Sequence, residues 1–236
     1  MFSFTDQTVL VVGGSSGIGL ATATAFAHAG ARVTIASRSA DKLAAAAAQI
    51  GHGTEWAELD TADNDAVEAL LGTRRWNHVV VSAAQTPSGP VRQLALDDAR
   101  KAMESKFWGA YRVARAANIA DGGSLTLISG FLSVRPSGTS VLQGAINAAL
   151  ESLVRGLALE FSPVRVNAVS PGMIRTPLWD GMEGEKREAL FKAVAEKVPA
   201  KRIGEAEDIA NAVLYAAATP FTTGSTILVD GGGAIA

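Results

Sequence analysis

The sequence of 236 residues predicts a single α/β domain, with helices on both faces of a parallel sheet. Two observations predict this fold class. Short β-rich runs alternate with longer alanine-rich stretches along the chain, a pattern typical of repeated strand–helix–strand units. The short runs are nearly all apolar rather than alternating, which is expected when both faces of a strand are covered.

Each element follows from this alternation. Six apolar runs are predicted as strands: 9–12, 32–36, 79–82, 124–128, 165–169 and 226–229. Six intervening stretches are predicted as helices: 17–29, 40–50, 64–71, 96–117, 143–161 and 205–217. The long stretch 175–202 fits neither pattern, and its prolines and glycines indicate a loop. Because 185–197 within it has helical character, we predict a helical substrate lid.

Composition excludes several classes of function. A net charge of −2 favours neither nucleic acid nor an anionic membrane as a partner. The chain has no cysteine, which rules out disulfides and thiolate catalysis, and its three histidines are too far apart to suggest a metal site. The sequence contains no apolar stretch of membrane-spanning length and no signal-peptide pattern at its start, so we expect a cytoplasmic protein.

A glycine-rich turn follows the first predicted strand and opens the first helix. It reads Gly13-Gly14-Ser15-Ser16-Gly17-Ile18-Gly19. Small residues allow the backbone to turn sharply and to approach a pyrophosphate, whose charge is met by N–H groups at the helix N-terminus. In this strand–turn–helix context the turn predicts a dinucleotide-binding site.

The spacing Gly13-x-x-x-Gly17-x-Gly19 resembles the fingerprint of the short-chain dehydrogenase/reductase family, and further matches cover essentially the whole chain. They are Asp60, at the position that follows the family's third strand, then Ser82-Ala83-Ala84, the segment 165–176 with Pro171-Gly172, and Asp230-Gly231-Gly232. The resemblance implies a Rossmann-like, doubly wound sheet of about seven strands. It also implies an oxidoreductase that acts on a small organic substrate as a homodimer or homotetramer.

The end of the second strand indicates which cofactor would bind. An NAD site normally has an acidic residue here for the ribose 2′-hydroxyl, but this chain has Ser37 followed by Arg38. A guanidinium suits a 2′-phosphate, so we predict NADP(H). By motif and resemblance the predicted cofactor residues are Gly13, Ser15, Ser16, Gly17, Ile18, Gly19, Ser37, Arg38, Ser39, Asp60, Thr61, Ser82, Ala83, Ala84, Asn147, Pro171, Gly172, Ile174 and Thr176.

The expected catalytic residues are absent. The resemblance places Gln143 at the family's proton-donating Tyr, Asn147 at its Lys, Gly130 at its Ser and Lys106 at its Asn. Ser129 and Ser133 lie next to the Ser position. Loss of a positioned general acid costs roughly 10²–10⁴ in rate, so ordinary ketone reduction is not expected. The candidate catalytic residues are therefore Lys106, Ser129, Ser133, Gln143 and Asn147.

Three alternatives follow from this set. Hydride could pass to an acceptor that needs no Tyr, such as an iminium carbon or an enone whose enolate is stabilised by N–H of Gln143 or by Ser129 or Ser133. Lys106 could restore the missing charge if it meets Asn147, although it could equally be a solvated lysine near Glu104. The protein could also bind NADP(H) only as a regulatory or inactive member. Glu151 is interpreted as part of a polar helix stripe.

Overall fold

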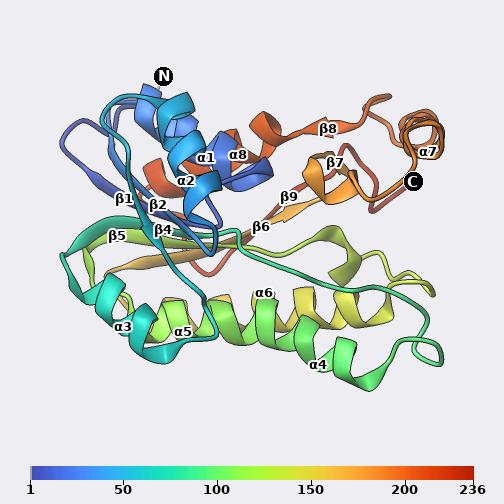
Figure 1. The fold of residues 1–236 in the computed structure, drawn as a ribbon, viewed down its shortest axis with the longest axis horizontal. Helices are drawn as coiled ribbons and strands as arrows, with labels where there is room; N and C mark the ends of the chain where they lie inside the picture. The colour runs from blue at the N-terminus through green and yellow to red at the C-terminus, as the bar shows by residue number, and fades with distance from the viewer. Residues whose placement is uncertain (1) are drawn as a thin grey trace.

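Seven parallel strands form the central sheet of the computed structural model, which describes residues 2–236. The order across the sheet is β3-β2-β1-β4-β5-β6-β9. It therefore changes direction between β1 and β4, which defines a doubly wound sheet (Figure 1). The strands are β1 Thr8–Val12, β2 Arg32–Ser37, β3 Glu55–Glu58, β4 Trp76–Val81, β5 Ile119–Ile128, β6 Arg165–Pro171 and β9 Thr226–Val229.

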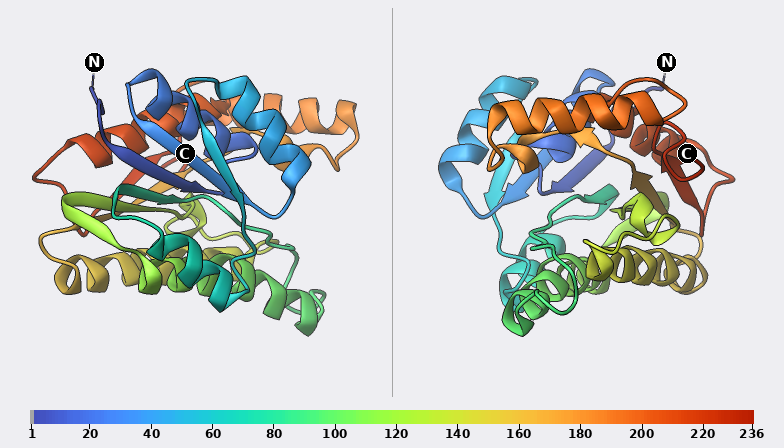
Figure 2. Two further views of the ribbon diagram at one scale, coloured as in Figure 1. Left: turned by 60° about the vertical axis from the view of Figure 1, so that its left-hand side comes forward. Right: turned by 90° about the vertical axis from the view of Figure 1, so that its right-hand side faces the viewer.

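Helices cover both faces of this sheet, as the sequence predicts. The helices are α1 Gly17–His28, α2 Ala40–Ile50, α3 Asn64–Gly72, α4 Leu96–Met103, α5 Gly109–Ala116, α6 Val141–Glu160, α7 Gly184–Lys197 and α8 Ala206–Ala218. Helices α1, α2 and α8 pack on one face, and α3, α5 and α6 pack on the other. In Figure 2 these two helical layers lie above and below the strands.

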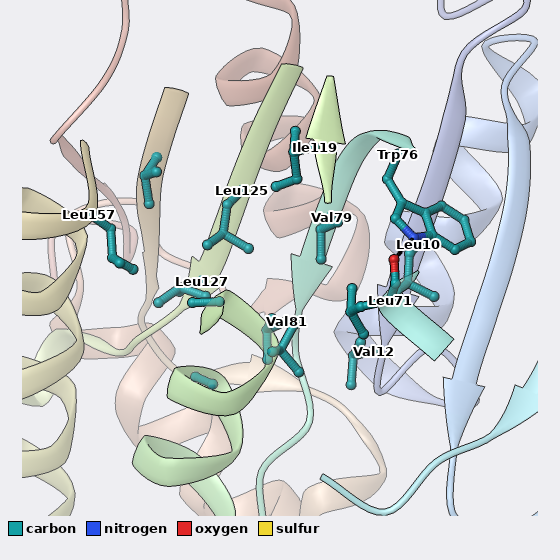
Figure 3. Close-up of a cluster of buried hydrophobic side chains, with 14 of the residues drawn as sticks. Leu10, Val12, Leu71, Trp76, Val79, Val81, Ile119, Leu125, Leu127 and Leu157 are labelled. Atoms are coloured by element: carbon teal, nitrogen blue, oxygen red, sulfur yellow. Dashed lines mark hydrogen bonds between the residues drawn. The ribbon is translucent and has the colours of Figure 1, made fainter. Parts of the chain in front are cut away.

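The core consists of two apolar clusters separated by the sheet. Along β1, Leu10 and Val12 face the cluster under α3, α5 and α6, whereas Val9 and Val11 face the cluster under α1, α2 and α8. Side chains alternate between the faces of a strand, so a continuous apolar run supplies both clusters. Figure 3 shows the first cluster, in which the buried Trp76 indole donates a hydrogen bond to the Leu71 carbonyl at 3.3 Å.

Two predicted elements differ from the structure. The stretch 96–117 is not one regular helix, because a π-helical turn, η1 Glu104–Trp108, separates α4 from α5. Such turns insert a residue into a helix and are frequent at functional sites. Strand β3 is missing from the six predicted runs, because its sequence EWAE is polar and it lies at the sheet edge with β2 as its neighbour.

The segment 175–202 contains α7, which agrees with the helical character predicted for 185–197. A short 3₁₀ turn, η3 Pro177–Trp179, precedes α7. Strands β7 Ile174–Arg175 and β8 Gly204–Glu205 pair with each other and hold the two ends of the segment together. Among residues 2–236, no helix is both long and apolar enough to cross a bilayer.

Candidate functional site

The glycine-rich turn leaves no room for side chains at two positions. A Cβ on Gly13 would lie 2.5 Å from the Ala83 amide nitrogen, and a Cβ on Gly19 would lie 2.1 Å from the Gly13 carbonyl oxygen. Gly13 also has φ +88°, a region that favours glycine. The turn is thus a backbone cradle packed against the residues after β4.

The start of α1 is open to an anion. Ser16 is the N-cap residue and forms no side-chain capping hydrogen bond. The first N–H groups of a helix have no partner within the helix, and its dipole favours negative charge there. Gly17 lies next to Thr176, since a Cβ on Gly17 would be 3.4 Å from the Thr176 Cβ. The structure thus brings the phosphate-binding turn and the end of segment 165–176 together, and the cradle fits a dinucleotide.

The end of β2 carries groups suited to a ribose phosphate. Arg38 is exposed. The Ser37 hydroxyl oxygen is buried and has no hydrogen-bond partner among the described residues. Ser39 caps α2, and its hydroxyl oxygen accepts from the Lys42 N–H at 3.5 Å, which leaves its own hydrogen free to donate. The 2′-phosphate contact at this strand end stays a prediction.

Other predicted cofactor residues have structural partners of their own. Asp60 accepts a hydrogen bond from the Ala62 N–H at 3.0 Å, and its adenine contact stays a prediction. Thr61, which follows it, accepts a 3.3 Å hydrogen bond from Arg112 at its carbonyl oxygen. Ser82 and Ala83 continue β4 and donate backbone N–H groups to the Val12 carbonyl at 2.8 and 3.1 Å.

The Pro171-Gly172 segment packs tightly against the C-terminal turn. A Cβ on Gly172 would lie 2.7 Å from the Asp230 Cα. Asp230 accepts N–H groups from Gly232 at 2.9 Å and from Ala234 at 2.6 Å. The matching motifs 165–176 and 230–232 therefore support each other, and they hold the backbone at the carboxyl end of β6.

Lys106 reaches the centre of the site. It lies in the π-helical turn, and its ammonium donates to the Asn147 Oδ1 at 2.6 Å and to the Ser129 carbonyl oxygen at 2.7 Å. The two side chains whose positions are exchanged according to the resemblance therefore meet, and a positive charge lies at the predicted site. The alternative interpretation, a solvated lysine beside Glu104, is wrong.

The surroundings of Lys106 change its acidity. Desolvation lowers the pKa of the Lys106 ammonium from 10.5 to about 8, and the negative charge of Glu151 acts in the opposite direction. A lysine with a pKa in this range exchanges protons near physiological pH. Lys106 is therefore chemically able to give or take a proton.

Gly130 and Asn147 fit each other. Gly130 stands where the resemblance places a serine, and a Cβ there would lie 2.7 Å from the Asn147 Nδ2. A serine at this position would therefore push the Asn147 amide away from Lys106. The small residue is a steric condition for the Lys106–Asn147 contact.

Glu151 is a site residue that the sequence interpretation missed. It is 8% exposed, and one of its oxygens accepts the Ser129 hydroxyl at 2.9 Å and the Ser133 hydroxyl at 2.7 Å. The interpretation as a polar helix stripe is wrong, because this face of α6 is turned toward the end of β5. The signal was present in the sequence, since residues four apart share a helix face and Glu151 follows Asn147 by four.

Gln143 is buried on the same face of α6, one turn before Asn147. Its Nε2 donates to the Thr86 carbonyl oxygen at 3.2 Å and to the Pro87 carbonyl oxygen. Both amide hydrogens are therefore used by the loop after β4, which argues against the predicted role of this N–H as an oxyanion donor. The Gln143 Oε1 is buried and has no partner among residues 2–236.

Comparisons with known proteins find relatives over nearly the whole chain. A family model described as enoyl-(acyl carrier protein) reductase matches residues 12–233. A short-chain dehydrogenase/reductase of Acremonium sp. is 31% identical, with 98% of this chain and 96% of the relative covered. The cis-4-hydroxycyclohexanecarboxylate dehydrogenase of Sinomonas cyclohexanicum is 30% identical, and the match covers 98% of this chain and 97% of the relative. A crystal structure of a small-chain dehydrogenase in complex with NADPH has 35% identity and a TM-score of 0.87, covering 98% of this chain and 99% of that one.

Proposed function

The chain belongs to the short-chain dehydrogenase/reductase family of oxidoreductases, and on that premise we propose that it is NADP(H)-dependent with a non-standard active site. The proposed reaction is hydride transfer to or from a small organic substrate that carries a carbonyl, imine or enone group. The site would be formed by Lys106, Asn147, Gln143, Ser129 and Ser133.

One observation carries this proposal. The Lys106 ammonium lies 2.6 Å from the Asn147 Oδ1 and 2.7 Å from the Ser129 carbonyl oxygen. An ammonium is strongly hydrated in water, so a lysine is rarely held in a desolvated site without a use for its charge or proton. Its position at the carboxyl end of the sheet is where ligands bind in doubly wound folds.

The chain's own residues would have distinct roles in binding and catalysis. The turn Gly13–Gly19 would hold the pyrophosphate, and Pro171, Gly172, Ile174 and Thr176 would line the nicotinamide side. When bound, NADP(H) supplies or accepts the hydride. Lys106 would provide positive charge beside the ribose and a proton to a developing anion on the substrate. Asn147 would fix the direction of the Lys106 ammonium by accepting one of its hydrogens.

The preference for NADP(H) over NAD(H) has independent support. Arg38 is exposed at the end of β2, and the nearby Ser37 hydroxyl lacks a partner within the described chain. A guanidinium forms charge-assisted, bidentate bonds with a phosphate. A related structure with 35% identity is titled as a complex with NADPH.

We further propose that segment 175–202 is the substrate lid and that the protein is a homo-oligomer. A cavity of about 260 Å³ lies between α7 and the Pro-Gly segment, and its lining includes Met173, Ile174 and Val198. The lining also includes the charged Arg202 and Asp208, and a cavity of mixed polarity next to the proposed nicotinamide position supports a lid. Trp108 and Tyr111 are 45% and 41% exposed and pack edge to face, which supports a subunit contact at η1 and α5.

The experiment is calorimetric titration of the purified protein with NADPH and NADH, followed by a substrate panel of imines, enones and ketones. Arg38→Gln should weaken NADPH binding by about tenfold to hundredfold and leave NADH binding unchanged. The matched control is Arg155→Gln, which removes an exposed arginine on α6 and should change neither affinity.

Turnover then separates the enzyme from its alternative. Lys106→Ala should reduce turnover while NADPH affinity stays largely intact. Binding of NADPH without turnover of any substrate class would instead favour a regulatory or inactive dinucleotide-binding protein. Absence of binding by either nucleotide would refute the proposal.

A further inference from the structure

The hydrogen-bond donors of Ser129, Ser133 and Gln143 near the proposed reaction site are already in use. The Ser129 and Ser133 hydroxyls each point to Glu151, and their other acceptors within reach are the carbonyl oxygens of Val169 and Gly130. A hydroxyl has one hydrogen. Neither serine therefore has a hydrogen to offer a substrate oxygen while the Glu151 carboxylate holds both.

The amide of Gln143 has one possible orientation. Its nitrogen contacts the carbonyl oxygens of Thr86 and Pro87. If the amide were turned over, its oxygen would face both carbonyl oxygens without a hydrogen between them. The nitrogen is thus fixed on the loop side, and the oxygen is left as a buried acceptor without a partner. A buried acceptor in this state is unfavourable, and a donor from a bound molecule would satisfy it.

This acceptor belongs to the same side-chain cluster as Lys106. Gln143 and Asn147 are one helical turn apart on α6, and both are buried. Asn147 contacts Lys106 and packs against Gly130 at the end of β5. The loop that binds the Gln143 nitrogen is open chain over 82–90 and is exposed at Ala84 and Gln85. Gln143 therefore shares the buried face of α6 with Asn147 and is held there by an exposed loop.

We propose that the reacting group of the substrate carries an N–H, as in a protonated imine of a primary or cyclic amine, and that this N–H binds the Gln143 Oε1. This inference rests on the proposed function. Selection between an imine and a ketone would then follow the direction of the hydrogen bond at Gln143. A ketone oxygen would face another acceptor at the Gln143 Oε1, whereas an imine N–H would donate a hydrogen bond to it.

The chemistry balances without a tyrosine. The imine nitrogen takes its proton from solvent before binding. Hydride from the reduced nicotinamide forms the new C–H bond, the C=N π electron pair moves onto nitrogen, and the cofactor is oxidised. The nitrogen keeps its proton, and the product is a neutral amine. No oxygen acquires charge, so no general acid is needed at the position of Gln143.

The test measures binding rather than turnover. Protein saturated with NADP⁺ is titrated with two probes of equal ring size: 2-iminopiperidine, a cyclic amidinium with N–H donors, and cyclohexanone, which has none. We expect the amidinium to bind about tenfold to hundredfold more tightly than cyclohexanone. Equal affinity of the two probes for the NADP⁺ complex would overturn the inference.

Two variants show whether the Gln143 oxygen is responsible. Gln143→Met and Gln143→Glu both remove the N–H groups that bind Thr86 and Pro87, but only glutamate retains an acceptor oxygen. The amidinium preference should disappear with methionine and persist with glutamate. If both variants lose it, the effect comes from the loop and the inference is wrong. NADP⁺ affinity and the thermal midpoint report whether each variant is folded, and Gln143→Leu replaces the methionine variant if that one is not.

The design separates the two proposals. If NADP⁺ does not bind to the unmodified protein, the proposed function fails. If NADP⁺ binds but the amidinium has no preference over cyclohexanone, the proposed function stands and the substrate class is wrong.

Discussion

The unusual acidity of Lys106 makes a prediction about folding stability that needs neither substrate nor cofactor. The pKa of this ammonium is lowered from 10.5 to about 8, chiefly by desolvation. Between these two pH values the unfolded chain binds more protons than the folded chain. The free energy of unfolding must therefore rise with pH across this window. In the Lys106→Met variant this contribution is absent.

The magnitude follows from the two pKa values. A difference of about 2.5 units, from 10.5 to about 8, corresponds to about 3 kcal/mol at 1.36 kcal/mol per unit. Below pH 8 the full cost of holding a charged lysine in the site is present, and above pH 10.5 it has gone. The stability difference between the wild-type protein and Lys106→Met should therefore change by about 3 kcal/mol in favour of the wild type.

Urea unfolding at intervals between pH 7 and 11 measures this difference. Subtraction of the two curves removes the titration of tyrosines and other lysines, which both proteins share. Lys101→Met is the control, because Lys101 has an exposed side chain and pairs with Asp98 at 3.4 Å on the protein surface. Its curve should run parallel to that of the wild type. If the Lys106→Met curve is parallel as well, Lys106 is solvated and the reasoning about the site is refuted.

Three further results are expected. Burial lowers the pKa of His78 to about 4, and the charge of Arg165 contributes a smaller part. The free energy of unfolding should therefore fall by about 3 kcal/mol as the pH drops from 6.5 to 4. Urea unfolding of the His78→Leu variant over the same pH range should lack this loss. Gly19→Ala should reduce NADPH affinity in calorimetry by at least about tenfold, because its Cβ would lie 2.1 Å from a backbone oxygen. Gly156→Ala, whose Cβ meets nothing within 4 Å, should keep the affinity and add about 0.5–1 kcal/mol of stability. Glu151→Gln should lower the pKa of Lys106 below about 8, which the pH dependence of amine labelling at Lys106 would report.

The sheet was predictable because its strands are buried on both faces. A continuous apolar run such as that around Val9 and Val11 is enough to identify such a strand. Strand β3 was not predicted, because an edge strand has one hydrogen-bonded neighbour and is less buried. Its sequence EWAE therefore contains no apolar run. The π-helical turn at 104–108 was not predicted, because the helical periodicity continues through it. One extra residue in a turn does not change the amino-acid composition in a recognisable way.

Part of the candidate site could be predicted from the sequence, but Glu151 and the directions of the hydrogen bonds could not. Position in the motifs identified Lys106, Asn147 and Gln143 as neighbours, and the contact between the first two follows from their exchanged positions. The direction of the Gln143 amide depends on the carbonyl oxygens of Thr86 and Pro87, which lie in a loop that no motif describes. The two serines likewise depend on Glu151, whose burial follows from the orientation of α6 rather than from its own sequence context.

The departures that the resemblance implies at Lys106, Gly130 and Asn147 would form one physical unit rather than three separate losses. Asn147 is short enough to leave space for the Lys106 ammonium and supplies the oxygen that holds it at 2.6 Å. Gly130 has to lack a side chain, because a Cβ would come within 2.7 Å of the Asn147 nitrogen. Replacing Asn147 with lysine alone would bring two ammonium groups together next to the Ser129 carbonyl, and replacing Gly130 with serine alone would displace the amide. A return to the family's residues would therefore require simultaneous changes, and single substitutions at these positions should damage the site instead of restoring it.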